Sequence, residues 1–383
     1  MQSKDEKEIL IIAGESSGDL HGSALVKNLL LLNPNFKIYG IGGDKMQKEG
    51  MELIYHTNKM AFLGFLEVIK HIPFIKKVQK DIVNFVEERN IKNIVLIDYP
   101  GFNLNIAKKF KKLNLNVIYY ISPQIWAWGS GRIKKIKSLI NKMLVVFPFE
   151  EKMYKQNLVD SVFVGHPLIS RLNDYKFLTK GELYSKLNLD YKKEILLLLS
   201  GSREQEVKSI FPECISAAKF LTEKYNLQIV VACSENIDKE IFYSLTDFKN
   251  FKTATGLTYD LLKHSKLGII KSGTSTLEAA LLELPMVIVY KTSAITYLIG
   301  KSLIKIKDIG MANILAGKKI VPELVQSKAK EKYIIEETEK FLTNIEFYNN
   351  TKEELKKIKE SLGKENASKK AAEIIASSLY AKR

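Results

Sequence analysis

Residues 9–22 read ILIIAGESSGDLHG, an apolar run that passes at Ala13 into a glycine-rich turn and then into a helical pattern. A continuous aliphatic run of this length is typical of a strand buried on both faces, as in a parallel sheet. Because glycines recur through the turn, a ligand can approach the backbone at the carboxyl end of the strand. We expect Asp19 or Ser17 to cap the following helix. A plain tight turn is the alternative, since the spacing is not that of a dinucleotide-binding loop.

The succession of strand, turn and helix continues along the chain, which predicts a parallel α/β fold. A chain of 383 residues is too long for one ordinary core, so we expect two such domains. Further buried strands are predicted at residues 37–41, 93–98, 117–121, 143–147, 162–164, 195–200, 228–233, 267–270 and 286–290. Polar residues accumulate over 165–189, and amphipathic helices close the sequence. The predicted domains are therefore 1–170 and 171–345, with the helices of 346–383 packing back on the first domain.

The composition limits which kinds of partner and which cellular location we expect. A formal net charge of +16 favours a polyanion, such as nucleic acid, anionic lipid or a phosphorylated substrate, although widely spread lysines can reflect composition alone. The two cysteines form no C-x-x-C motif, no apolar run is long enough to span a membrane, and the first residues do not resemble a signal peptide. We therefore expect a reduced, cytoplasmic protein.

Two motifs in the first half place polar and aromatic side chains directly after predicted strands. Residues 96–103 read LIDYPGFN, so Asp98 is expected at the carboxyl end of a strand, where α/β proteins bind their ligands. Residues 122–128 read SPQIWAW and hold both tryptophans of the chain, which suit stacking on a sugar or an acyl chain. A loop-capping aspartate and a packed lid are the structural alternatives.

Two motifs in the second half have the character of a nucleotide site. Residues 200–207 read SGSREQEV and residues 271–278 read KSGTSTLE, and each stretch leads from a predicted strand into a helix. Small residues, backbone amides and Arg203 at a helix start suit a diphosphate, and Glu278 can accept a hydrogen bond from a ribose hydroxyl. The first turn lacks the ending of a Walker loop. Simple capping of buried helices is the alternative interpretation of both motifs.

The motifs AGESSGD, DYPGFN, SPQIWAW, FPFE, VGHP, GSR, KSGTSTLE and NILAG occur in an order and at spacings that resemble the lipid A disaccharide synthases, from about residue 9 to residue 326. The resemblance implies an α/β fold of GT-B type, with two doubly wound Rossmann-like domains facing each other across a cleft. It also implies an inverting glycosyltransferase. The donor would be UDP-2,3-diacylglucosamine and the acceptor 2,3-diacylglucosamine 1-phosphate (lipid X). The products would be the β-1,6-linked lipid A disaccharide 1-phosphate and UDP.

The same resemblance implies roles for particular residues. Asp98 would be the general base, without the second acid that many relatives have at the position of Gly101. His21 and His166, in or beside the motifs, are competing proton carriers, with a structural role as the alternative for each. The nucleotide sugar would be bound by Gly201, Ser202, Arg203, Ser272, Gly273, Thr274, Glu278 and Asn313. The acceptor-side loops would contribute Gly14, Glu15, Ser16, Ser17, Gly18, Asn103, Gln124 and Trp126. No D-x-D motif occurs, so neither a metal nor another cofactor is expected.

Residues 61–80 read AFLGFLEVIKHIPFIKKVQK and interleave apolar with basic side chains. This pattern favours a peripheral contact with the anionic inner leaflet of the cytoplasmic membrane, although half of the segment would suit a domain core equally well. The residues expected at the membrane are Phe62, Phe65, Leu66, Ile69, Lys70, Phe74, Lys76 and Lys77.

Two other functions fit parts of the sequence. An enzyme of the UDP-N-acetylglucosamine 2-epimerase type would share the nucleotide-binding half but would not need the apolar surface of residues 61–80. A nucleic-acid-binding protein would explain the net charge of +16, yet the sequence has no recognised binding module or basic stripe. We therefore expect two acylated sugars and a membrane surface as partners, and no nucleic acid. A homodimer is left open.

Overall fold

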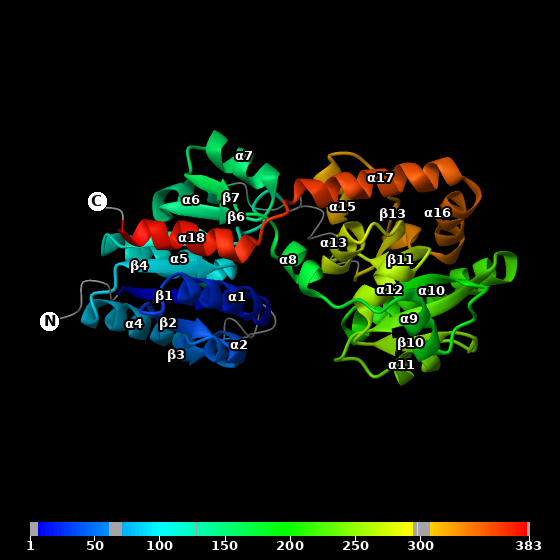
Figure 1. The fold of residues 1–383 in the computed structure, drawn as a ribbon, viewed down its shortest axis with the longest axis horizontal. Coiled ribbons are helices and arrows are strands. Elements are labelled where there is room, and N and C mark those ends of the chain that lie inside the picture. Colours follow the sequence, from blue (N-terminus) through cyan, green and yellow to red (C-terminus); the bar gives the residue numbers. More distant parts are fainter. Residues whose placement is uncertain are drawn as a thin grey trace. The chain divides into compact units, whose positions relative to one another are not determined.

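The computed structural model describes residues 7–60, 71–127, 129, 131–293, 297 and 307–380. The chain divides into two compact units, of which unit 1 comprises Met1–Asn173 with Leu362–Arg383 and unit 2 comprises Asp174–Ser361 (Figure 1). Each unit contains a parallel β-sheet with helices packed on it, so the predicted α/β architecture is confirmed.

Unit 1 is built on a parallel seven-stranded sheet of order β3-β2-β1-β4-β5-β6-β7. Its strands are β1 (Glu8–Ala13), β2 (Lys37–Gly42), β3 (Glu52–His56), β4 (Asn93–Ile97), β5 (Asn116–Tyr120), β6 (Lys142–Val145) and β7 (Ser161–Phe163). Its helices are α1 (Ser16–Leu32), α2 (Asp44–Lys48), η1 (Thr57–Lys59), α4 (Ile72–Glu88), α5 (Pro100–Lys112), α6 (Arg132–Leu139), α7 (Pro148–Gln156), α8 (Pro167–Asp174) and α18 (Ala367–Tyr380). The direction of strand order changes between β1 and β4, and ligands of α/β sheets bind at the carboxyl ends beside such a point.

Unit 2 repeats this plan with a parallel six-stranded sheet of order β10-β9-β8-β11-β12-β13. Its strands are β8 (Glu194–Leu199), β9 (Leu227–Cys233), β10 (Lys252–Thr255), β11 (Leu267–Lys271), β12 (Met286–Tyr290) and β13 (Glu323–Val325). Its helices are α9 (Lys180–Leu187), α10 (Glu204–Lys224), α11 (Glu240–Ser244), α12 (Thr258–His264), α13 (Thr274–Leu281), α15 (Met311–Ala316), η2 (Gln326–Lys328), α16 (Glu331–Thr343) and α17 (Ile345–Ser361). Here the strand order changes direction between β8 and β11.

The predicted strands are all present, within two residues at either end. The structure adds β3, β10 and β13, and each of these lies at the edge of its sheet. An edge strand has a neighbour on one side only, so it can be short and polar. The sequences ELIYH and KTAT of β3 and β10 are largely half-exposed or exposed, which removes the apolar signal by which the central strands were found.

The two C-terminal helices belong to different units (Figure 1). α17 packs on α13, α15 and α16 of unit 2, whereas α18 packs on α1 of unit 1. The ion pairs Lys318–Glu354 (2.8 Å) and Lys359–Glu283 (2.9 Å) also join α17 to unit 2. The sequence predicts that all of 346–383 packs on the first domain, whereas α17 packs on unit 2. An apolar stripe shows that a helix docks on something, but it does not identify the surface that receives it.

Candidate active site

Asp98 and Tyr99 follow β4 and both adopt the left-handed backbone conformation, with φ of 43° and 46°. Consecutive non-glycine residues rarely do so, and the strain needs surrounding contacts to hold it. The backbone carbonyl of Asp98 accepts hydrogen bonds from Asn103 Nδ2 (2.8 Å) and from the hydroxyl of Tyr119. The backbone N–H of Asp98 donates to the carbonyl of Tyr120 at 3.2 Å. The backbone of the candidate base is therefore fixed on both sides.

The glycine-rich turn after β1 lies beside this residue. The register pairs Ala13 with Ile97, so Gly14 and Asp98 follow neighbouring strands at the point where the strand order changes direction. The ring of Tyr99 packs directly against Gly14: a Cβ atom added there would lie 2.1 Å from Tyr99 Cδ1. The hydroxyl of Tyr99 donates to the carbonyl of Met60 at 3.1 Å. A glycine is thus required at position 14 by close approach.

The electrostatic surroundings of Asp98 favour its protonated form more than water does. Burial, together with the negative charge of Glu15, raises the pKa of Asp98 to about 6, against the lowering effect of a hydrogen bond from the Tyr99 backbone. The same two causes raise the pKa of Tyr99. Glu15, at the start of α1, is therefore close enough to act on both groups.

The rest of the turn after β1 contains both exposed residues, which a ligand can reach, and buried residues, which stabilise the fold. Ser16 and Ser17 are exposed, whereas Gly18 and Asp19 are buried. The prediction that Asp19 or Ser17 caps α1 is wrong: Glu15 occupies the N-cap position without a side-chain hydrogen bond. Asp19 Oδ1 instead accepts from the amides of Gly43 (2.7 Å) and Met46 (3.1 Å), so it caps α2.

The loop after β5 carries Gln124, which is exposed, and Trp126, which is half-buried. Trp126 Nε1 donates to Glu150 Oε1 at 3.0 Å, and Glu150 Oε2 accepts from the amide of Phe147 at 3.3 Å. Glu150 is only 1% exposed, and burial raises its pKa to about 7 despite these hydrogen bonds, which lower it. A buried carboxylate thus holds the indole of Trp126.

His21 on α1 and His166 before α8 are poorer candidates for the base than Asp98. Burial, aided by the charge of Arg171, lowers the pKa of His21 to about 4. Burial, aided by His21, lowers the pKa of His166 to about 3. A general base is most effective when its pKa lies near the working pH, which favours the carboxylate with a pKa of about 6.

In unit 2 the turns after β8 and β11 are also neighbours, because Leu199 pairs with Ile270 where the strand order changes direction. Ser202 and Arg203 are exposed on the first turn, and Gly273 and Thr274 on the second, with Ser272 buried. Gly201 has a φ of 133°, which favours glycine. The structure therefore brings the two predicted phosphate-binding motifs together.

Glu206 and Lys271 connect these two turns. Glu206 Oε2 accepts from the amide of Ser202 at 3.1 Å, and Glu206 Oε1 is 2.9 Å from Lys271 Nζ. Burial would raise the pKa of Glu206, but the hydrogen bond and charge of Lys271, the hydrogen bond from the Ser202 amide and the charge of Arg203 together hold that pKa below the ordinary value. Both residues lie within the sequence motifs at 200–207 and 271–278, but only the fold shows that they meet.

The two remaining residues of the predicted nucleotide site, Glu278 and Asn313, differ in burial and in their hydrogen-bond partners. Glu278, on α13, is half-buried and accepts from the hydroxyl of Tyr259 at 3.2 Å. Asn313 is completely buried: its Nδ2 donates to the carbonyl of Val321 and to Glu323, and its Oδ1 accepts from the amides of residues 320 and 321. All donors and acceptors of this amide are thus used inside the fold. Asn313 stabilises the connection between α15 and β13 rather than offering a hydrogen bond to a ligand.

The predicted membrane segment is only partly described by the structure. Phe74 is half-buried against the core of unit 1, with its ring 6.2 Å from that of Tyr55, while Lys76 and Lys77 are exposed on α4. Five further predicted contacts lie outside the described residues, namely Phe62, Phe65, Leu66, Ile69 and Lys70. Among the residues that the structure does describe, no helix is long and apolar enough to cross a membrane.

The whole chain is similar to proteins of one family. The family described as "Lipid-A-disaccharide synthetase" matches residues 9–377. The lipid-A-disaccharide synthase of Geobacter metallireducens is 36% identical over 392 residues, covering 100% of both chains. The protein of that name from Coxiella burnetii (strain RSA 331 / Henzerling II) is 36% identical over 372 residues, covering 96% of this chain and 98% of its own length.

Solved structures with the same architecture include an epimerase and a glycotransferase. UDP-GlcNAc 2-epimerase from Neisseria meningitidis gives a TM-score of 0.60 at 12% identity, covering 98% of this chain and 99% of its own. The glycotransferase of kitacinnamycin gives 0.63 at 11% identity, covering 97% and 98%. At such identities the likeness concerns the fold alone, and it confirms the predicted GT-B type. Full-length similarity, by contrast, selects the transferase over the epimerase, and the chain belongs to the lipid-A-disaccharide synthase family of glycosyltransferases.

Proposed function

We propose that this enzyme transfers the sugar of UDP-2,3-diacylglucosamine to the 6-hydroxyl of 2,3-diacylglucosamine 1-phosphate, with inversion at the anomeric carbon. The products are the β-1,6-linked disaccharide 1-phosphate and UDP. Membership of the family supports lipid A disaccharide formation. The observation that carries the mechanism is Asp98, a half-buried carboxylate at the strand-order switch of unit 1, with a pKa of about 6.

In the proposed reaction Asp98 takes the proton of the acceptor hydroxyl while the acceptor oxygen bonds to the anomeric carbon. The bond from that carbon to the diphosphate breaks, and its electron pair passes to a phosphate oxygen of UDP. A carboxylate with a pKa of about 6 is still ionised at neutral pH but more basic than an ordinary aspartate. Because the backbone around Asp98 is fixed by Asn103 and Tyr119, little reorganisation is needed.

On the donor side, Arg203 and the turns after β8 and β11, whose residues Ser202, Gly273 and Thr274 are exposed, would offset the charge that grows on the leaving UDP. Glu278 would accept from the ribose hydroxyls, with Tyr259 holding its carboxylate. Among the described residues no cluster of His, Cys, Asp or Glu could hold a metal ion. We assign the diphosphate to cationic side chains and helix N-termini of unit 2.

The test is incubation of the enzyme with both acylated sugars, followed by mass spectrometry and by NMR of the new anomeric proton. We expect the disaccharide phosphate, a β linkage and loss of product with Asp98→Asn. Formation of an α linkage would contradict the inverting mechanism. Conversion of UDP-N-acetylglucosamine to its 2-epimer, without any transfer, would instead support the epimerase alternative.

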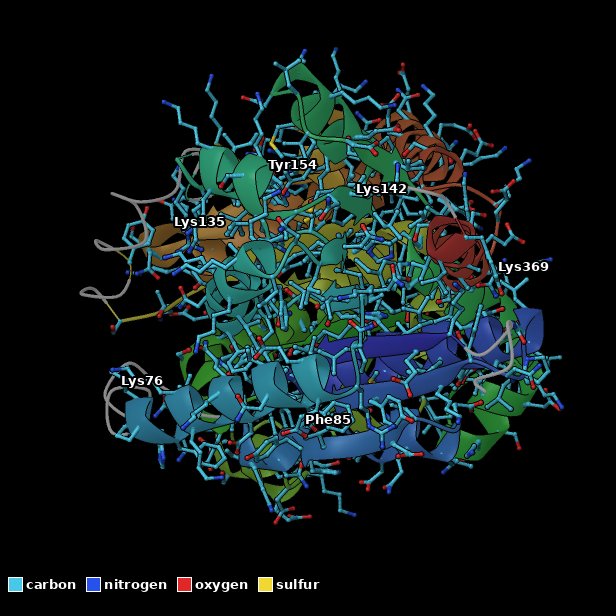
Figure 2. All side chains as sticks on the ribbon, turned by 90° about the vertical axis from the view of Figure 1, so that its left-hand side faces the viewer. Lys76, Phe85, Lys135, Lys142, Tyr154 and Lys369 are labelled. Atoms are coloured by element: carbon cyan, nitrogen blue, oxygen red, sulfur yellow. The ribbon has the colours of Figure 1, made fainter. Side chains whose placement is uncertain are left out.

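We further propose that unit 1 rests on the anionic cytoplasmic face of the membrane that holds these substrates. Between Asp98 and Glu150 the sequence has nine Lys and Arg residues and no Asp or Glu. Partial burial, with the charges of Lys108 and Arg132, lowers the pKa of Lys135, which shows that cations crowd together on α5 and α6. Figure 2 shows Lys135 and Lys76 toward the same edge of unit 1. An anionic surface relieves such crowding.

Sedimentation with vesicles tests this surface. The double variant Lys134→Glu with Lys137→Glu, both exposed on α6, should reduce binding to vesicles that contain anionic phospholipid. The matched control Lys192→Glu with Lys193→Glu makes the same charge change on exposed positions of unit 2 and should bind normally. If the α6 variant and the unit 2 control bind the anionic vesicles equally well, the proposal that α6 contacts the membrane is wrong.

A further inference from the structure

The ammonium group of Lys271 lies over the turn that opens α13. Lys271 is the last residue of β11, and its Nζ is 3.8 Å from the position that a Cβ on Gly273 would take. The side chain is 19% exposed, so the charge is sheltered without being shut off from solvent. A cation at a helix N-terminus faces the positive end of the helix dipole, which is unfavourable unless a negative partner is present.

Glu206 supplies such a partner and ties it to the second turn. One carboxylate oxygen is 2.9 Å from Lys271 Nζ, and the other accepts from the Ser202 amide at 3.1 Å. The second oxygen also lies 2.7 Å from the position of a Cβ on Gly201, so a larger residue there would displace the carboxylate. Glu206 therefore places the ammonium beside both exposed turns.

An ammonium group has three N–H donors, and Glu206 uses one of them. Donors thus remain for further acceptors, next to the backbone amides at the starts of α10 and α13. An oxygen of a diphosphate can accept from one of these remaining donors while Glu206 keeps its own hydrogen bond. A lysine is a compact cation well suited to phosphate oxygens.

We infer that Lys271 binds the diphosphate of the donor and of the leaving UDP, and that Glu206 is a positioning residue that holds the ammonium over the turn at Gly273. The inference rests on the proposed function, in which unit 2 binds UDP. Lys271 then shares with Arg203 the stabilisation of the phosphate oxygen that receives the electron pair of the broken bond. Lys271 is thus an addition to the nucleotide-site residues that the sequence predicts.

Calorimetry with UDP and with uridine tests the inference on the full-length protein. Lys271→Met removes the charge at similar length and should weaken UDP binding by about 10- to 100-fold. Uridine binding should stay within about twofold, since uridine has no phosphate for the ammonium to contact. Lys271→Arg should recover most of the UDP affinity. Glu206→Gln should give a smaller loss for UDP and none for uridine.

Lys208→Met is the matched control, because Lys208 is an exposed lysine of α10 that pairs with Glu204. It should bind UDP as the parent does. Unchanged UDP affinity in Lys271→Met would overturn the inference. So would an equal loss for UDP and uridine with a lower melting temperature, which would indicate a structural lysine. If the parent protein binds neither compound, the proposed UDP site of unit 2 is wrong. If the parent binds UDP and Lys271→Met binds it equally well, only the role of Lys271 is wrong.

Discussion

The ring of Tyr99 occupies the space beside Gly14 so closely that a Cβ atom on Gly14 would lie 2.1 Å from it. Tyr99 follows Asp98 in the chain, and both residues have a positive φ. The glycine-rich turn after β1 and the carboxylate after β4 are thus one packed assembly. Any side chain at position 14 must move the ring, and with it the backbone that carries Asp98.

Gly14→Ala should therefore lower both stability and turnover. Forcing an extra methyl group into a packed site costs about 1–3 kcal/mol, and the shift of Asp98 should reduce kcat more than the affinity for UDP. Gly101→Ala is the control for stability, because a Cβ there meets nothing within 4 Å. Thermal melting and steady-state rates check the pair, and a fully active Gly14→Ala enzyme would contradict the packing argument.

Asp98→Asn should lower turnover by about 100-fold or more while leaving UDP binding intact, because the proposed base is lost and the proposed donor site lies in unit 2. The same change should raise the melting temperature at pH 8. Since folding raises the pKa of Asp98 from 3.8 to about 6, the stability contributed by its protonated form is lost as the pH rises through that range. An amide stays neutral throughout. A variant that melts lower than the parent at pH 8 would contradict this reasoning.

The pH profile of kcat/KM should show a rising limb with a midpoint of about 6, where Asp98 becomes ionised. The charge of Glu15 is one cause of the raised pKa, so Glu15→Gln should move the midpoint to lower pH. A midpoint that does not respond to this substitution would show that another group controls the limb.

Glu150→Gln should weaken the dependence of stability on pH. Burial raises the pKa of Glu150 from 4.5 to about 7 at 1% exposure, so ionisation opposes folding by up to about 3 kcal/mol above that pKa. The loss of stability between pH 5 and pH 8 should therefore be smaller in the variant, as measured by denaturant unfolding. KM for the acceptor should rise, because the partner that fixes the indole of Trp126 has changed. An unaltered pH dependence would contradict a buried, titrating Glu150.

Arg203→Ala should weaken UDP binding by about 1.5–3 kcal/mol, the usual contribution of a hydrogen bond to a charged group. Glu278→Ala should also weaken UDP binding, and in addition uridine binding, because ribose is common to both ligands. Calorimetry with the two compounds checks this division. If neither variant loses affinity, the donor binds at another place on the protein.

The sequence predicts the centre of each sheet better than its margins. Strands such as β1 and β8 are covered on both faces, so their residues form unbroken apolar runs. β3, β10 and β13 lie at the edges of their sheets and lack such runs, so the sequence does not predict them. The motifs at the strand ends were found for the same reason, because each stands directly after a central strand.

What the sequence could not reveal are partnerships between distant residues. Asp19 caps α2 rather than its own helix, and Asn313 forms its hydrogen bonds with the backbone between α15 and β13 of unit 2. Glu150 and Trp126 are 24 positions apart, and Glu206 and Lys271 are 65 apart. Such contacts depend on strand order, which alternation of hydrophobicity does not encode.

The return of α18 to unit 1 has a consequence for how the protein is made. The ribosome must finish all of unit 2 before it produces the helix that packs on α1. At about 5–20 residues per second, this delay is on the order of 10–40 s. Throughout that interval the face of α1 that α18 later covers is exposed on the nascent unit 1. Co-translational chaperones can bind that face until α18 has been made.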